Sequence, residues 1–148
     1  LDIAPKQYNR HHDDILEGLN ALDTNTLQSR SEAEAILSNY IKDKSLIGFL
    51  LKSLILREGQ YSWRINVPAL TKEYENILAS PLISGRVQIN TLFLRGNNSD
   101  YILDEDDVLI NGLFKQSKMI TIENAGHWLH AEQPEKVLDA MTAFIEKT

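Results

Sequence analysis

The sequence VQINTLFLRG at residues 87–96 decides the fold class, because it ends in a near-continuous apolar run before a glycine. Such a run is typical of a strand covered on both faces, as in a parallel sheet. DEDDVLINGLFKQ at 104–116 predicts a helix, since its early acidic residues favour the helix dipole. KMITIEN at 118–124 predicts a second strand, and QPEKVLDAMTAFIEK at 133–147 an amphipathic helix with a proline in its first turn. The order strand, helix, strand, helix indicates an α/β protein.

The residues before this region predict a mainly helical insertion. Residues 13–22 carry apolar side chains at helical spacing, with Asp13 as a candidate N-cap. Ser31 and Glu34 form a candidate capping box for a second helix. SLIGFLLKSLIL at 45–56 predicts a third helix, apolar nearly all round, that is either buried or lines an apolar cavity.

Two more elements are expected in this insertion. LREGQYSWRIN at 56–66 holds two short runs around Glu58 and Gly59, which is typical of a β-hairpin. Pro68 is expected to start a helix that extends to about Leu78. The opening LDIAP, in contrast, has the extended, apolar character of a strand.

The composition excludes several classes of protein. A net charge of −6, with lysine and arginine scattered along the chain, gives no electrostatic footprint for nucleic acid or for an anionic membrane surface. No apolar run approaches the roughly 20 residues that span a bilayer. The chain has no cysteine, which excludes a disulfide framework and a cysteine zinc site and fits a cytoplasmic protein. No metal site is expected either, because His130 lacks a third ligand at a suitable spacing.

ENAGHWLHAEQPEKV at 123–137 sets a Gly-His pair after the second predicted strand and before the last helix. This segment resembles the α/β-hydrolase superfamily, in which the general base lies on the loop after the final core strand, commonly in a Gly-His followed by Glu and Pro. Gly126, His127, Glu132 and Pro134 fit that pattern. An imidazole suits the role, because it takes a proton from a serine hydroxyl and returns it to the leaving group.

Further segments resemble the YbfF-type bacterial esterases, namely LDIAP, FLLKS, WRINVP, GNNS and GHWLHAE. The resemblance implies the C-terminal part of an α/β-hydrolase fold, a parallel sheet with flanking helices and a helical cap. Under it, residues 1–6 are the end of a core strand and 7–86 a mostly helical cap with a connecting helix. Residues 87–148 are then the C-terminal core strands and helices that carry His127.

The resemblance also suggests which carboxylate orients His127. In the YbfF-type group the acid lies at the end of the strand that opens DIAP, which implies Asp2. The superfamily's usual place is after the strand that begins near Val87, where RGNNSDY offers Asp100 as the only carboxylate. Asp2 is therefore the predicted acid and Asp100 the alternative.

The nucleophile elbow G-x-S-x-G of this superfamily is absent from the sequence. We therefore expect the chain to be a fragment, inactive alone, that pairs with an N-terminal segment of the same protein carrying the serine. The completed protein is expected to hydrolyse a small carboxylic ester or thioester without a cofactor. The alternative is a non-catalytic α/β-hydrolase-like module that binds a ligand.

Overall fold

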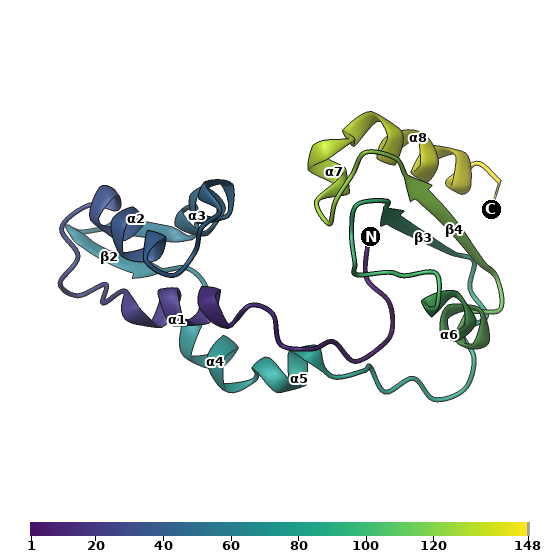
Figure 1. Ribbon diagram of the computed structural model, residues 1–148, viewed down its shortest axis with the longest axis horizontal. Coiled ribbons are helices and arrows are strands. Elements are labelled where there is room, and N and C mark those ends of the chain that lie inside the picture. Colours follow the sequence, from purple (N-terminus) through teal and green to yellow (C-terminus); the bar gives the residue numbers. More distant parts are fainter. Residues whose placement is uncertain (148) are drawn as a thin grey trace. The chain divides into compact units, whose positions relative to one another are not determined.

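The computed structural model describes residues 1–147, which form two compact units. The first unit contains Leu1–Gln7 and the region from Ser80 onward, and the second is Tyr8–Ala79. Figure 1 shows that each unit has its own helices and its own pair of strands. The expected cap region 7–86 thus contains the second unit and also Gln7 and residues 80–86, which belong to the first. Thr148, the end of the expected C-terminal region, lies outside the described residues.

The first unit is built on two parallel strands, β3 (Thr91–Gly96) and β4 (Ser117–Ile122). They run in the register Thr91↔Ser117 to Gly96↔Ile122. Helix α6 (Asp106–Leu113) lies between them in the chain, and α7 (Leu129–Glu132) and α8 (Pro134–Ile145) follow β4. The predicted order of strand, helix, strand and helix is therefore confirmed.

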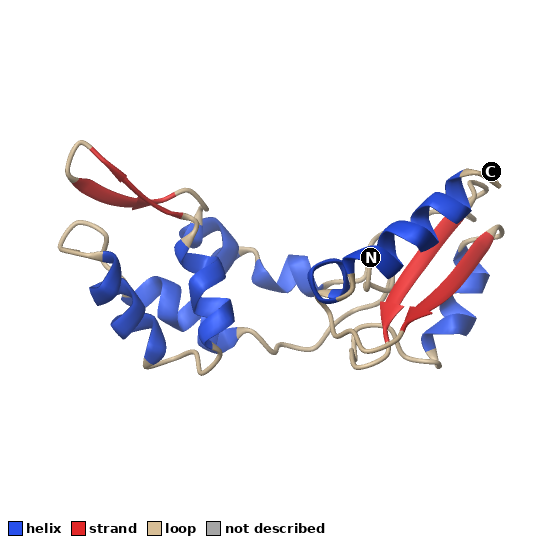
Figure 2. Ribbon diagram, turned by 90° about the horizontal axis from the view of Figure 1, so that it is seen from above, coloured by secondary structure: helices blue, strands red, loops and turns tan. Residues whose placement is uncertain are grey.

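Helices α6 and α8 cover opposite faces of this sheet, as Figures 1 and 2 show. Alternation along β3 explains this arrangement, since successive side chains of a strand point to opposite faces. Leu94 packs with Val137 of α8, whereas its neighbour Phe93 packs with Ile110 of α6. Both faces are therefore apolar, as the continuous run had indicated.

The strand predicted from Val87 begins later than expected. Val87 makes only an isolated parallel bridge to Phe114, and β3 starts at Thr91. The Thr91 hydroxyl donates to the carbonyl of Ile89 at 2.9 Å, a local bond that competes with a regular ladder.

Residues 1–6 were expected to be the end of a core strand, but the structure assigns no strand there. Asp2 has a φ of 45°, a left-handed conformation that interrupts an extended chain. Its backbone N–H nevertheless donates to the carbonyl of Leu94 at 2.6 Å. The segment therefore runs beside β3 and is fixed to it at Asp2.

The second unit contains five helices and a hairpin among its described residues. Its elements are α1 (Asp13–Ala21), α2 (Arg30–Ser38), α3 (Lys44–Leu51), β1 (Leu54–Arg57), β2 (Gln60–Trp63), α4 (Val67–Lys72) and α5 (Tyr74–Leu78). All of these elements except α5 contribute to one apolar core, and α1, α2 and α3 supply most of it. No helix in residues 1–147 combines the length and the apolar character needed to cross a bilayer.

The predicted third helix is too long, because α3 ends at Leu51 and Leu54 begins β1. An apolar run of this kind fits a buried helix and a buried strand equally well. The predicted hairpin is confirmed, with Arg57 paired to Gln60 across a two-residue turn. Glu58 and Gly59 have φ values of 49° and 80°, as a type I′ turn requires.

The starts of α1 and α2 also differ from the prediction. Asp13 is the first residue of α1, and His12 precedes it as the N-cap. Helix α2 is capped by Ser29, not Ser31, since the Ser29 hydroxyl accepts from the Glu32 N–H. The same S-x-x-E spacing recurs two residues earlier than expected, and the Glu32 carboxylate accepts from the Gln28 N–H.

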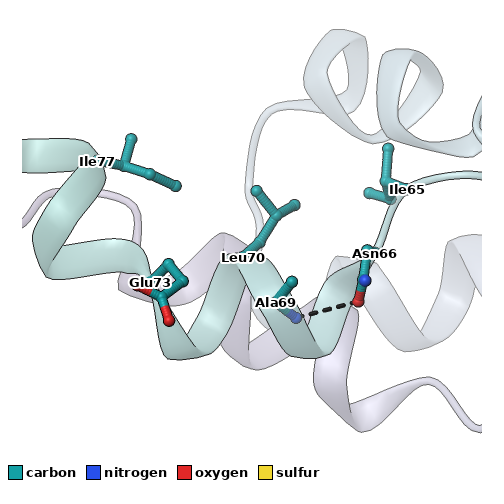
Figure 3. Close-up of a pocket in the computed structure, with 6 residues that line it drawn as sticks. All are labelled: Ile65, Asn66, Ala69, Leu70, Glu73 and Ile77. Carbon is teal, nitrogen blue, oxygen red and sulfur yellow. Dashed lines mark hydrogen bonds between the residues drawn. The ribbon is translucent and has the colours of Figure 1, made fainter.

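The predicted helix from Pro68 to Leu78 is broken at Glu73 into α4 and α5. Asn66 caps α4 by accepting the Ala69 N–H at 3.1 Å (Figure 3). The two helices border a shallow, mainly apolar groove of about 360 Å³, lined by Ile65, Asn66, Ala69, Leu70, Glu73 and Ile77. It lies wholly within the second unit.

Helix α3 contributes chiefly to the core of the second unit. Ile47, Leu50 and Leu51 are buried in that core, whereas Phe49 is 46% exposed. Core packing therefore accounts for most of the apolar SLIGFLL segment.

Candidate active site

His127 lies on the loop that joins β4 to α7, at the carboxyl end of the sheet. The loop turns at Asn124, whose φ is 61°, and Ala125 is fully buried after it. The Gly126 N–H donates to the Glu132 carboxylate at 2.9 Å, which ties the loop to α7. A loop in this place presents its side chains where ligands bind in open α/β sheets.

Asp2 and His127 are in direct contact. The Asp2 Oδ2 atom lies 2.9 Å from the His127 Nδ1 atom. A carboxylate only accepts hydrogen bonds, so Nδ1 carries the proton in this pair and Nε2 is the nitrogen able to accept another. The Asp2 side chain is fully buried, whereas that of His127 is 40% exposed. The buried Asp2 carboxylate thus acts on an imidazole that is itself accessible from the surface.

Two further donors satisfy the buried Asp2 carboxylate. The Gly96 N–H donates to Oδ1 at 3.0 Å, and the Ser99 hydroxyl donates to Oδ2 at 2.5 Å. Charge-assisted hydrogen bonds of this kind are what make a buried carboxylate tolerable. Asp2 is therefore held from β3 and from the loop after it, with its charge directed at His127.

The structure brings together Asp2 and His127, as the resemblance implied, and it does not place the alternative acid against His127. Asp100 is exposed, and it is Asp2 that accepts the hydrogen bond from His127. The sequence analysis assigned no role to Ser99, although the GNNS segment that contains it contributes to the resemblance. Its position in the loop that follows a core strand was the available signal.

A close approach of two backbones fixes the distance between the two loops of the site. A Cβ atom on Gly96 would lie 2.3 Å from the Gly126 carbonyl oxygen, so only glycine fits there. Beside it, the Asn98 N–H donates to the Ala125 carbonyl at 2.9 Å, and the Ala125 N–H donates to the Asn97 side chain. These contacts align the loop after β3 with the loop after β4.

An ion pair fixes the other end of the N-terminal segment. The Lys6 ammonium lies 2.5 Å from the Asp106 carboxylate at the start of α6. Asp106 is 6% exposed and also accepts the Leu103 N–H at 2.8 Å. The acidic run at 104–107 therefore anchors the segment that carries Asp2, in addition to starting a helix.

Comparison with known proteins gives consistent relatives. No protein-family model matches the chain. The chain is 37% identical to esterase YbfF of Escherichia coli (strain K12), over 98% of the chain and 56% of that protein. It is 36% identical to the sn-1-specific diacylglycerol lipase ABHD11 of Mus musculus, over 80% of the chain and 38% of that protein.

A solved structure shows the same arrangement. A marine microorganism esterase superposes with a TM-score of 0.92 and 38% identity, over 97% of the chain and 58% of the esterase. The chain therefore spans about half the length of the curated relatives that it matches along its whole length.

Proposed function

Since the chain belongs to the α/β-hydrolase superfamily, we propose that it forms the histidine- and acid-bearing part of a serine-type carboxylic ester or thioester hydrolase. The observation that carries this proposal is the hydrogen bond between the buried Asp2 carboxylate and the part-exposed His127. An oriented imidazole beside a buried acid is the machinery of acyl transfer. The names of the relatives, esterase and lipase, agree with this chemistry.

The proposed mechanism assigns one task to each residue. A serine hydroxyl, supplied from outside this chain, attacks the acyl carbonyl while His127 Nε2 takes its proton. The negative charge of Asp2 stabilises the imidazolium that results and keeps Nδ1 protonated. His127 then returns the proton to the departing alkoxide or thiolate, which leaves an acyl-enzyme. A water molecule then attacks the acyl-enzyme with His127 again as the base, and the carboxylic acid product is released as the serine is regenerated.

The serine is proposed to come from an N-terminal segment of the same protein. Within the described residues β3 pairs with β4 alone, and a two-stranded sheet is marginal in water. Leu138, Met141 and Ile145 of α8 also form an exposed apolar stripe at helical spacing. The relatives are nearly twice as long as this chain, which leaves room for such a segment.

The second unit, which is mainly helical and has an apolar groove bordered by α4 and α5, is proposed to act as the cap of this hydrolase. The absence of cysteine supports a cytoplasmic location for the protein.

The test is hydrolysis of a short-chain ester by the chain assembled with its N-terminal segment. His127→Ala should remove nearly all activity, and His130→Ala, a histidine three positions away, should leave it intact. Loss of activity in both variants, or in neither, would contradict the role of His127.

The groove in the second unit favours one alternative, a module that binds an apolar ligand without hydrolysing it. The groove is mainly apolar, as small-molecule sites usually are, and it holds no group that resembles a nucleophile and base pair. Leu70→Asp should abolish binding of a fluorescent fatty acid if this function is real. Binding that survives His127→Ala, without any ester hydrolysis by the assembled protein, would favour the module over the enzyme.

A further inference from the structure

Tyr101 covers one face of the His127 imidazole. The two ring centroids are 3.7 Å apart and the ring planes differ by only 19°, so the rings are stacked. A hydrogen bond from Nδ1 to Asp2 fixes one edge of the imidazole. It leaves the ring able to turn about the contact, because the terminal torsion of histidine has a broad energy minimum. A stacked ring removes that freedom.

The loop that carries Tyr101 is itself fixed on both sides of the ring. The Tyr101 N–H donates to the Ser99 hydroxyl at 3.3 Å, and this hydroxyl donates to Asp2. The next residue, Ile102, is 2% exposed and packs with Ala4 and Ile110. The position of the aromatic ring is thus set by the same contacts that hold the carboxylate.

The geometry points to Tyr101 as a positioning residue for His127. Its ring holds the imidazole in the plane that directs Nδ1 to Asp2, and its electron-rich face stabilises the imidazolium during acyl transfer. The inference deepens the proposed function, since the second effect matters only if His127 shuttles a proton. Two titratable groups, the Asp2 carboxylate and the Tyr101 ring, contact the imidazole directly.

Two substitutions at Tyr101 distinguish the effect of its aromatic ring from that of its hydroxyl group, and both are made in the assembled protein. Tyr101→Leu should lower kcat roughly 10- to 100-fold with little change in KM, because the base is misaligned while the substrate surface is intact. In proton NMR the His127 ring signals should lose the upfield shift that a stacked aromatic ring imposes. Tyr101→Phe should keep both the kcat and the shift.

Tyr40→Leu serves as the matched control, because Tyr40 is 39% exposed and lies in the second unit. This substitution should change neither kcat nor the His127 ring signals. Tyr101→Met is a second non-aromatic variant in case the leucine variant fails to fold. Unchanged kcat and unchanged His127 signals without the aromatic ring would overturn the inference, as would a phenylalanine variant that behaves like leucine. If no form hydrolyses an ester but the His127 signals still follow the ring, the positioning stands and the proposed hydrolysis fails.

Discussion

The Oδ2 atom of Asp2 lies 2.9 Å from the Nδ1 atom of His127, although 125 positions separate the two residues in the chain. Asp2 belongs to a segment held against β3 by its own backbone, and His127 to the loop after β4. The contact therefore depends on the placement of the N-terminal segment as much as on the histidine loop.

Asp2→Asn should lower kcat about 10⁴-fold in the assembled protein. An amide cannot stabilise an imidazolium, and its NH₂ group favours the wrong tautomer of His127. Asp100→Asn is the control, because Asp100 is an exposed aspartate in the loop that also carries Ser99. Steady-state kinetics on both variants decides between the two acids, and a large loss confined to Asp100→Asn would reverse the assignment.

Gly96→Ala should destabilise the first unit by roughly 1 to 3 kcal/mol, because the new methyl group would lie 2.3 Å from the Gly126 carbonyl oxygen. Gly112→Ala is the matched control, since a Cβ there meets nothing within 4 Å and Gly112 lies in α6. That control should raise stability by about 0.5 to 1 kcal/mol. Denaturant unfolding measures both changes, and equal stability of the two variants would refute the crowding at Gly96.

Lys6→Met should cost roughly 1 to 3 kcal/mol of stability, because it leaves the Asp106 carboxylate buried without its cation. It should also reduce kcat, since Lys6 anchors the segment that carries Asp2. Lys72→Met is the control, because the Lys72 side chain is 82% exposed and lies 3.9 Å from Glu73. A surface pair of that kind contributes little. Similar effects of both substitutions on thermal unfolding would speak against the anchor.

The 148 residues alone should aggregate or form a loosely packed chain without esterase activity. Each buried backbone group without a partner costs on the order of 1 to 3 kcal/mol, against a total stability of about 5 to 15 kcal/mol. Co-expression with the N-terminal segment should restore packing and hydrolysis. A cooperative thermal transition from the isolated monomer would contradict this expectation. Ester hydrolysis by the isolated chain, abolished by His127→Ala, would mean that one of its own serines is the nucleophile.

Local patterns in the sequence were enough to predict β3, α6, β4 and α8 of the first unit, although β3 begins later than expected, and to place the loop of His127. The period of side chains and the Gly-His flanks carry this information within a few residues. Asp2 came only from a resemblance, because nothing near it in the sequence predicts a partner at position 127. Ser99 and Tyr101 were missed for the same reason, since their roles arise when the loop after β3 closes on distant residues. Leu54 was misassigned to a helix because an apolar run alone does not separate helix from strand.

The left-handed backbone of Asp2, with its φ of 45°, restricts which residues position 2 can hold, in addition to the need for a carboxylate. Glycine, asparagine and aspartate adopt this conformation more readily than other residues. In a library of all substitutions at this position, selection for folding should thus retain these three, and selection for turnover only aspartate. Glutamate would supply a carboxylate but would not readily adopt the left-handed backbone. Asparagine would adopt that backbone but could not stabilise the imidazolium. Position 2 therefore has two separate requirements, a residue that adopts a left-handed backbone for folding and a carboxylate for turnover.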